Sequence, residues 1–246
     1  MRIASVLRLS ALLFCALLVH SQAQAGVVIT GTRLIYPASQ KEITVKLNNN
    51  GTRPALVQSW IDSGDVNTSP TKSTAPFVLS PPVSRIDPGK GQSLRLMFTG
   101  AKLPADKESV FWLNVLEIPP KATGPVDLNA LQMAFRSRIK IFYRPDGLPG
   151  TASDAPKQLQ WKVVAIDKGY ALQVFNPTAF HVSEVDLALM IGSQSYESEN
   201  GMVGPGQTKT FALPTLKAPL SGGGEVQYNA INDYGALVPT RQPLTP

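Results

Sequence analysis

Apolar residues recur along this chain in short runs, most of them separated by Gly, Pro, Asn or Asp. After residue 26, no stretch keeps the 3.6-residue apolar period of an amphipathic helix. Short runs of β-branched and aromatic residues between turn formers predict β-strands. In the first half of the chain, the predicted strands are Val27–Thr30, Thr32–Tyr36, Glu42–Leu47, Ala55–Ile61, Phe77–Ser80, Ser93–Phe98, Ser109–Leu116 and Leu128–Tyr143. In the second half, they are Leu159–Val164, Ala171–Phe175, His181–Met190, Thr208–Leu213 and Glu225–Ile231.

A segment rich in proline and glycine separates these two groups of strands. It reads RPDGLPG at residues 144–150, which predicts a linker or hinge. Seven or eight short strands in roughly 100 residues are typical of an immunoglobulin-like sandwich. The predicted fold class is therefore all-β, with two immunoglobulin-like β-sandwich domains. We place the N-terminal domain at residues 26–146 and the C-terminal domain at residues 147–246.

The segment Leu131–Tyr143 shows the most regular alternation in the chain. Apolar residues fill most of its odd positions, and basic or polar residues fill most of its even ones. At ~3.3 Å per residue, this strand would be about 43 Å long, over twice the usual length. We expect Ile139–Tyr143 to lie in the domain core and Leu131–Phe135 to project apolar groups at a sheet edge. Two interpretations remain open: both halves are core, or the projecting half is donated to a partner whose own sheet is incomplete.

Residues 1–25 have the layout of a secretory signal peptide. Arg2 and Arg8 precede nine apolar residues at 11–19, and a small-x-small exit ends at Ala25. A hydrocarbon core requires ~20 apolar residues, so this run predicts secretion without membrane insertion. We predict cleavage after Ala25.

Removing this leader changes the composition in ways that exclude several chemistries. The only cysteine of the chain, Cys15, lies in the leader, and the mature chain keeps a single histidine, His181. Disulfides, Cys/His zinc sites and cysteine catalysis are thereby excluded. Two of the 23 basic residues also belong to the leader, so the mature chain carries 21 basic and 17 acidic residues. This mild positive charge contains no block of like charges, and it does not favour nucleic-acid binding.

Enzyme motifs in the mature chain lack essential members. The segment GMVGPGQT at 201–208 is similar to a phosphate-binding loop, but Gln207 replaces the required lysine, so we interpret it as a turn. His181 lies in a strand-like FHV context, and we interpret it as an ordinary strand residue. Three acidic pairs at a spacing of two are interpreted as acids on exposed strand faces: Asp106/Glu108, Glu184/Asp186 and Glu197/Glu199. The sequence predicts no enzymatic activity, no metal and no cofactor.

Six segments, spread over the mature chain, carry a family resemblance. They are LVQSWID at 56–62, PPVSRIDPG at 81–89, LPADKESVFWLNVLEIPP at 103–120, IKIFYRP at 139–145, FNPT at 175–178 and INDYG at 231–235. In this order they resemble the periplasmic chaperones of the chaperone–usher pathway of pilus assembly, the PapD-like family. The resemblance implies two immunoglobulin-like domains in an L or boomerang arrangement. It also implies a periplasmic chaperone that binds, folds and caps fimbrial (pilin) subunits by donor-strand complementation and delivers them to an outer-membrane usher.

The resemblance also implies roles for individual residues. The donated hydrophobic side chains would be Leu131, Met133 and Phe135. The pair that anchors the C-terminal carboxylate of the subunit would be Arg33, in TRLIY, and Lys140, in RIKIFY. Two cations give such a carboxylate charge-assisted hydrogen bonds, which fix the register of the added strand.

A further implied set, Glu108, Arg144 and Asp233, would form a structural salt bridge between the domains. The connection before the long strand lacks a cysteine pair, which favours the short-loop type of chaperone. The projecting apolar edge is also compatible with self-association of the free protein.

The alternative function is that of a secreted two-domain β-sandwich adhesin or carbohydrate-binding module. It would need exposed aromatic platforms, and aromatic residues make up only 7% of the chain.

Overall fold

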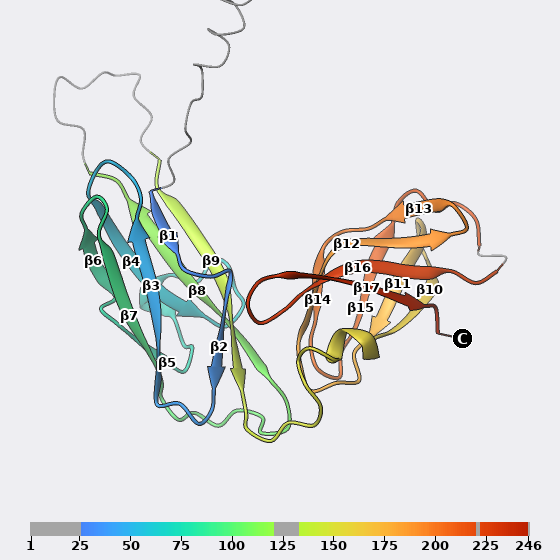
Figure 1. Cartoon of the computed structure of the whole chain (residues 1–246), viewed down its shortest axis with the longest axis horizontal. Coiled ribbons are helices and arrows are strands. Elements are labelled where there is room, and N and C mark those ends of the chain that lie inside the picture. The colour runs from blue at the N-terminus through green and yellow to red at the C-terminus, as the bar shows by residue number, and fades with distance from the viewer. Residues whose placement is uncertain (1–25, 121–132, 220–221, 246) are drawn as a thin grey trace, which may run out of the picture.

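The computed structural model describes residues 26–120, 133–219 and 222–245 of the chain. Their strands form two β-sandwiches, which meet at an angle and give the molecule the shape of an open V (Figure 1). Two short 3₁₀ helices, η1 (Pro70–Lys72) and η2 (Ala155–Gln158), accompany them. No helix among the described residues is long and apolar enough to cross a membrane. The all-β prediction with two domains in an L arrangement is therefore confirmed. The predicted leader and Leu131 lie outside the described residues.

The N-terminal sandwich packs a four-stranded sheet against a five-stranded one. Alternation of side chains places apolar groups between the sheets, as in β3, where Val45 and Leu47 are buried and their neighbours are exposed. The first sheet has the order β1 (Val27–Ile29), β3 (Glu42–Asn49), β7 (Gly91–Phe98) and β5 (Phe77–Ser80). The second has the order β2 (Arg33–Pro37), β9 (Phe135–Arg144), β8 (Ser109–Ile118), β4 (Ala55–Asp62) and β6 (Val83–Ile86).

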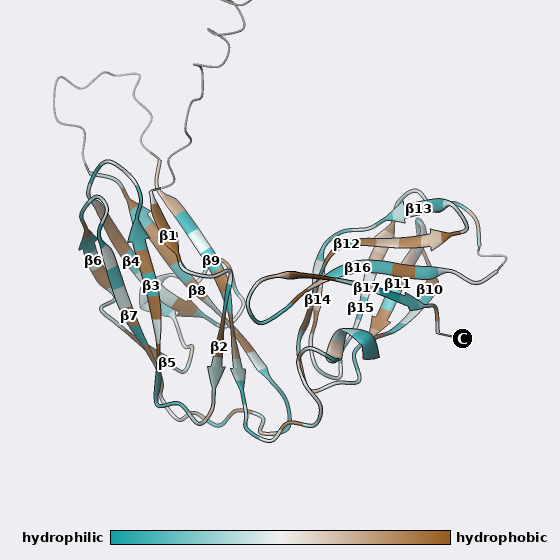
Figure 2. Ribbon diagram, in the orientation of Figure 1, coloured by the Kyte–Doolittle hydropathy of each residue, from teal (hydrophilic) through white to brown (hydrophobic). Residues whose placement is uncertain are grey.

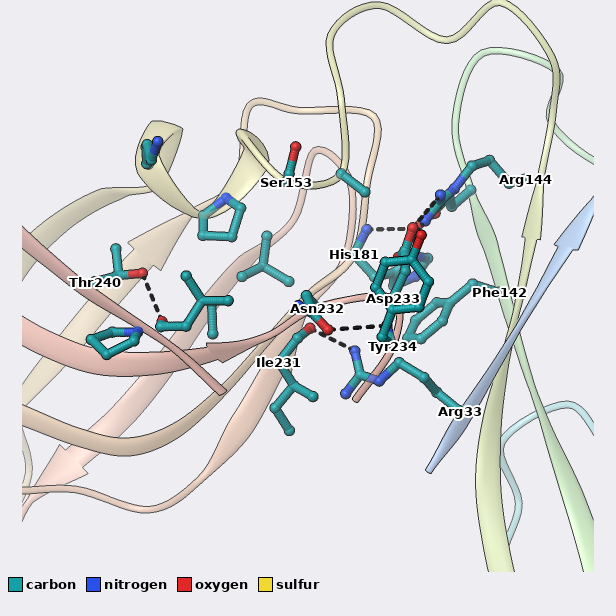
Figure 3. Close-up of a pocket in the computed structure, with 18 of the residues that line it drawn as sticks. Arg33, Phe142, Arg144, Ser153, His181, Ile231, Asn232, Asp233, Tyr234 and Thr240 are labelled. Carbon is teal, nitrogen blue, oxygen red and sulfur yellow. Dashed lines mark hydrogen bonds and ion pairs between the residues drawn. The ribbon is translucent and has the colours of Figure 1, made fainter. Parts of the chain in front are cut away.

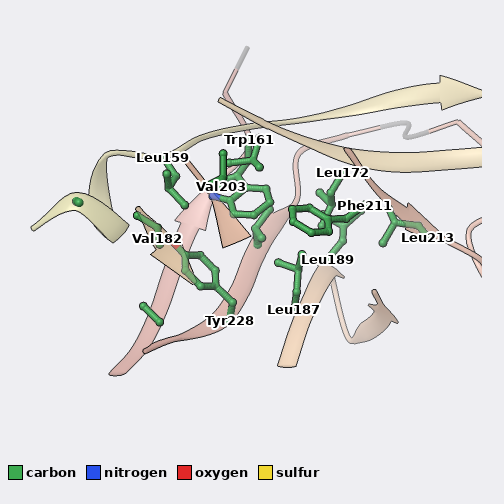
Figure 4. Packing of buried hydrophobic residues seen from close by; sticks show 14 of the residues in the cluster. Leu159, Trp161, Leu172, Val182, Leu187, Leu189, Val203, Phe211, Leu213 and Tyr228 are labelled. Carbon is green, nitrogen blue, oxygen red and sulfur yellow. The ribbon is translucent and has the colours of Figure 1, made fainter. Parts of the chain in front are cut away.

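The C-terminal sandwich has its own core, in which Trp161, Leu172 and Phe211 are fully buried (Figure 4). One sheet has the order β10 (Gln160–Ile166), β11 (Gly169–Phe175) and β15 (Thr208–Leu213). The other has the order β13 (Gln194–Glu197), β12 (Val182–Ile191), β16 (Glu225–Ile231) and β17 (Leu237–Pro243), and β14 (Gly201–Val203) also pairs with β12. Each sandwich has a separate hydrophobic cluster, and apolar residues follow the strands in both (Figure 2).

The hairpin of β16 and β17 reaches from the C-terminal sandwich toward β2 and β9 (Figure 1). The Nη1 of Arg33, at the start of β2, donates a hydrogen bond of 2.8 Å to the carbonyl oxygen of Ile231, at the end of β16. Near the hinge, the backbone N–H of Glu108 donates to the carbonyl oxygen of Ala179 over 2.9 Å. Hydrogen bonds thus join the two domains at two places, the β16–β17 hairpin and the region near the hinge.

The structure corrects two interpretations made from sequence. The segment at 201–208 is not wholly a turn, because residues 201–203 form β14 and pair with β12. The acidic pairs do not all lie on exposed faces, because Glu108 and Glu184 are buried, 4% and 0% exposed. Glu184 and Asp186 are also separated by a bulge between Val185 and Ala188, at which Asp186 has a φ of 54°. A bulge breaks the simple two-residue alternation on which the shared-face argument depends.

Candidate functional site

Strand β9 has one edge that is only half occupied. Its inner edge pairs with β8 over the whole strand, from Phe135 to Tyr143. Its outer edge pairs in parallel with β2, and that pairing starts at Lys140. Within the described part of the chain, no strand pairs with the outer edge between Phe135 and Ile139. The backbone groups of this open edge are available to another strand.

The side chains of β9 divide as the alternation predicts. Ile141 is fully buried, and Ile139 and Tyr143 pack against the N-terminal core. At the other end, Phe135 is 62% exposed and Met133, just before the strand, is 55% exposed. The strand Phe135–Arg144 spans ten residues and begins later than the predicted strand Leu128–Tyr143, because Met133 and Ala134 are not in the ladder and the residues before them lie outside the described residues.

Arg33 and Lys140 lie side by side, because the parallel pairing of β2 and β9 makes them register partners. Each also reaches the C-terminal domain: Arg33 bonds the Ile231 carbonyl, and the Nζ of Lys140 donates to the Oγ of Ser183 over 3.2 Å. Among the described residues, neither cation forms a salt bridge with a carboxylate. They line a cavity of about 310 Å³ together with Trp112, Arg138 and Gly235, among others; we call it the clamp cavity.

Burial and like charge both act on this pair. Burial lowers the pKa of Lys140, and the positive charge of neighbouring Arg33 lowers it further. Burial also lowers the pKa of Arg33. A bound anion would relieve the repulsion between the two groups and replace part of the hydration that each has lost. The arrangement therefore favours an anion that can accept hydrogen bonds from both.

A second ionic network borders the clamp cavity. Arg138 holds Asp62 with two hydrogen bonds of 2.9 and 2.6 Å, and the Asp62 side chain is only 1% exposed. Burial raises the pKa of Asp62, but hydrogen bonds from Arg138, Asn114 and the Gly64 N–H outweigh it and keep the pKa below its usual value. The Cζ of Arg138 also lies 4.6 Å from the ring centroid of Trp112.

The predicted interdomain residues are in contact. The Nε of Arg144 donates to Glu108 over 2.7 Å, and its Nη1 and Nη2 donate to the two carboxylate oxygens of Asp233 over 2.7 and 2.8 Å. Burial lowers the pKa of Arg144, but its bonds and the two negative charges outweigh burial, so that the pKa is raised overall. Arg144 thus joins the N-terminal domain to the β16–β17 hairpin.

His181 is a member of this network that sequence reasoning missed. It precedes β12 and is not a strand residue; its backbone N–H donates to Glu108 over 2.7 Å, and its Nδ1 lies 3.2 Å from the same oxygen. The only signal in the sequence was that His181 is the single histidine after the leader. The network borders a second interdomain cavity, of about 390 Å³, over which Tyr234 lies 93% exposed (Figure 3).

The described residues contain no group of three or more His, Cys, Asp or Glu side chains that could hold a metal ion. His181 faces the carboxylate of Glu108, which is already bound to Arg144. What the site offers is an open strand edge with apolar side chains at one end and two cations at the other.

Comparison with known proteins matches both halves of the chain. Residues 26–149 match the family model described as "Pili and flagellar-assembly chaperone, PapD N-terminal domain". Residues 154–242 match "Pili assembly chaperone PapD, C-terminal domain".

Individual relatives are similar over most of their length. The chain is 43% identical over 221 residues to the probable fimbrial chaperone YadV of Escherichia coli K12, covering 89% of each chain. It is 45% identical over 230 residues to the chaperone protein FimB/FhaD of Bordetella pertussis, covering 88% of this chain and 87% of the relative.

Two solved structures are also similar. The crystal structure of the YadV chaperone has a TM-score of 0.78 and 42% identity, covering 89% of this chain and all of the other. A Salmonella enterica structure of the SafA pilin in complex with the SafB chaperone gives a match with a TM-score of 0.73 and 27% identity, covering 91% of this chain and 99% of the matched one.

Proposed function

The chain belongs to the PapD-like family of pilus-assembly chaperones, whose members are not enzymes, and we propose that it captures fimbrial subunits by adding β9 to their incomplete sheets. In this proposal, it acts in the periplasm after the loss of residues 1–25 and delivers the capped subunit to an outer-membrane usher. The observation that carries the proposal is the open edge of β9 from Phe135 to Ile139, which ends at the paired cations Arg33 and Lys140.

The position of β2 fixes how a subunit strand can lie on this edge. Since β2 occupies the edge from Lys140 onward, an added strand must end where β2 begins, at Arg33. A strand whose C-terminus reaches the two cations therefore runs parallel to β9. Its apolar partners would be Phe135 and Met133, which are exposed, and Leu131, which precedes them in the sequence. Burying each of these side chains stabilises the complex by roughly 1.5–3 kcal/mol.

In this arrangement, Arg33 and Lys140 anchor the terminal carboxylate of the subunit. Hydrogen bonds to charged groups contribute about 1.5–3 kcal/mol each, and this anchor sets the register of the whole added strand. A slip of one residue would turn every side chain of the added strand to the opposite face. The anchor therefore supplies specificity of register, and the apolar side chains supply most of the buried area.

We assign a structural role to Glu108, Arg144 and Asp233. By linking the hinge strand β9 to the β16–β17 hairpin, they hold the C-terminal domain in place beside the open edge. The cleft between the two domains, into which the open edge of β9 faces, then keeps a fixed width. Less conformational entropy is therefore lost when a subunit binds.

Co-expression with its fimbrial subunit tests this function. Arg33→Ala or Lys140→Ala should abolish the complex recovered from the periplasm, because each removes one of the two bonds to the carboxylate. Lys46→Ala is the matched control, since Lys46 is an exposed lysine on β3, in the sheet away from the cleft. Recovery of the Lys140→Ala complex at the level of the Lys46→Ala complex would contradict the anchoring role.

A further inference from the structure

We propose that Glu117 binds the α-ammonium group that cleavage after Ala25 creates at Gly26, and that this ion pair holds strand β1 on the N-terminal sandwich. We call the pair of Glu117 and the Gly26 ammonium group the N-terminal latch. Its ligand is the chain's own N-terminus, so the site is filled once secretion has removed the leader. The inference rests on the predicted cleavage site and does not depend on how a subunit binds.

Glu117 occupies an unusual position for a carboxylate. It follows Phe111, Leu113 and Val115 at two-residue steps along β8, and all three of these side chains are buried in the N-terminal core. Alternation therefore directs Glu117 to the same inner face, at the end of the strand, where it is half-buried. A carboxylate that has lost part of its hydration requires hydrogen bonds or an opposite charge.

The opposite charge is not supplied by a side chain. In the described ranges, Glu117 forms no salt bridge with a lysine, arginine or histidine. Its Oε2 accepts a hydrogen bond of 2.8 Å from the backbone N–H of Val27, the first residue of β1. The carboxylate is therefore already directed at the N-terminal end of the mature chain.

Gly26 packs directly on this carboxylate. A Cβ atom built on Gly26 would lie 2.6 Å from the Cδ of Glu117 and 2.5 Å from its Oε2, so any side chain here would displace the carboxylate. The Gly26 nitrogen is bonded to the same α-carbon and therefore lies within about 5 Å of Oε2. At such a distance, an opposite charge favours the ionised form of a group. The carbonyl oxygen of Gly26 accepts a bond of 2.9 Å from the Asn50 N–H, which fixes the residue beside the end of β3.

Cleavage changes the charge of the Gly26 nitrogen. In the uncleaved chain this nitrogen is a neutral amide, whereas after cleavage it is an amino group with an ordinary pKa of about 7.7–8.0. Beside Glu117, the ammonium form gains a charge-assisted hydrogen bond. A chain cut one residue earlier or later would carry its ammonium group roughly 3.5 Å away from this position. The latch therefore favours the product of one particular cleavage.

The latch connects the two sheets of the N-terminal sandwich. β1 is an edge strand of the first sheet, and β8, which carries Glu117, belongs to the second. In the second sheet, Glu117 is the register partner of Phe135 on β9. The mature N-terminus is thus held at the end of the sandwich where the outer edge of β9 is open.

Strand register shows what release of this segment would allow. The parallel pairing of Arg33 with Lys140, continued toward the N-terminus, would lay residues 28–32 along Phe135–Ile139, over the open edge. In the structure, the chain instead turns at Gly31, whose φ is 95°, and residues 27–29 pair with β3. By holding β1 there, the latch leaves the edge of β9 free. Only this last consequence rests on the proposed function.

The test follows the α-carbon resonance of Gly26 by NMR, in the mature chain made with isotope-labelled glycine, from about pH 6 to about pH 10. The pKa of its amino group should lie above about 8.5, because the carboxylate favours the ammonium form. In Glu117→Gln it should return to about 7.7–8.0, since Gln keeps an acceptor for the Val27 N–H but has no charge. The control is Glu42→Gln, which removes a carboxylate from β3, the neighbour of β1, and should leave the pKa of the Gly26 amino group raised.

Two further measurements test the position of the charge. A chain that keeps Ala25 before Gly26 should have a folding equilibrium constant about three- to tenfold lower near pH 7 than the chain that starts at Gly26. The difference should disappear as the pH rises through the pKa of the folded chain, where the ammonium group loses its proton. The Thr30 amide, which bonds the Lys46 carbonyl over 2.9 Å, should exchange with deuterium faster by a similar factor in Glu117→Gln, because β1 opens more often.

Each outcome either supports or overturns the latch. An ordinary pKa for the amino group of the unmodified chain would overturn it, and this measurement requires no variant to fold. A raised pKa that persists in Glu117→Gln would reject Glu117 as the partner. A mature protein whose mass shows a first residue other than Gly26 would reject the ligand, and unchanged exchange at Thr30 would show that the ion pair does not hold β1. None of these results depends on subunit capture, so failure of the latch and failure of the proposed function are distinguishable.

Discussion

Two buried ionisable side chains of this chaperone have very different surroundings. Arg144 is compensated by the two carboxylates that it joins, Glu108 and Asp233. Glu184 is not compensated: it is 0% exposed, and within the described structure neither of its carboxylate oxygens has a hydrogen-bond partner. A buried carboxyl without such partners is held in its neutral form. The buried charge of Arg144 is thus paired with two carboxylates, whereas burial of the Glu184 carboxyl should make folding depend on pH.

The first prediction concerns Glu184 and the pH dependence of stability. Burial raises its pKa to about 8, and the positive charges of Lys209 and Lys140 only partly oppose this. The unfolded chain has the ordinary pKa of 4.5, so this contribution to stability is complete below about pH 4.5. It is then lost as the pH rises toward 8, at up to about 1.4 kcal/mol per pH unit. Glu184→Gln should remove this dependence from denaturant unfolding curves of the mature chain.

The free energy of unfolding of the unmodified chain and of Glu184→Gln, measured at two pH values, tests this prediction. Near pH 4.5 their free energies of unfolding should be similar, and at pH 8 the Gln variant should be the more stable. Parallel pH profiles for Glu184→Gln and the unmodified chain would show that the carboxyl does not titrate in this way.

Residue roles were recoverable from sequence to different degrees. The alternation around Lys140 places it on the polar face of a strand, but no local pattern distinguishes Arg33 from other surface cations, and only the family resemblance selects it. The two become neighbours through a parallel pairing of strands that are far apart in the chain. Local periodicity carries no information on such pairings, which explains why the contacts of Arg138 with Trp112 and of His181 with Glu108 were not predicted either.

At the scale of elements, the strands that sequence reasoning missed are β6, β13, β14 and β17. β6, β13 and β17 each lie at the end of a sheet, and β14 pairs only with β12. Edge strands need less apolar character, and β17 even contains two prolines, which are tolerated only where a ladder hydrogen bond is not required. The inner strands are found from sequence because both of their neighbours impose burial on them.

The second prediction concerns the exposed end of β9. Phe135→Asp should abolish recovery of the chaperone–subunit complex, because it places a charge where an apolar side chain would enter the subunit. The free energy of unfolding of the free protein should change by less than about 0.5 kcal/mol, since Phe135 is 62% exposed. Its matched control is Val78→Asp, at an apolar position that is 49% exposed on β5, the edge strand of the other sheet. If the two variants recover equal amounts of complex, the donor role of Phe135 is wrong.

At the scale of the whole molecule, two sandwiches with separate cores are joined by few contacts. Arg144 is central among these contacts, because its side chain bonds Glu108 in one domain and Asp233 in the other. Relative motion is the usual expectation for two domains of one chain unless a large apolar interface holds them. We therefore expect this network to control the width of the cleft.

The third prediction isolates that effect. Asp233→Asn weakens the bond to the hairpin and leaves the Arg144–Glu108 pair intact, so the domains should move more freely while each keeps its own stability. Small-angle X-ray scattering should show a larger radius of gyration, and subunit capture should fall. The control is Asp87→Asn, which breaks an exposed pair with Arg85 within one domain. An unchanged scattering profile for Asp233→Asn would mean that other contacts hold the angle.

The central claim is that a subunit strand binds along the outer edge of β9, and hydrogen–deuterium exchange of the chaperone tests it most directly. Exchange should be compared for the free chaperone and for its complex with a fimbrial subunit, at the backbone amides from Phe135 to Ile139. Backbone N–H groups alternate in direction along a strand, so the amides of this stretch that point away from β8 should become protected in the complex, while those of edge strand β5 exchange as before. Unchanged exchange from Phe135 to Ile139 in a complex that is otherwise intact would contradict strand addition.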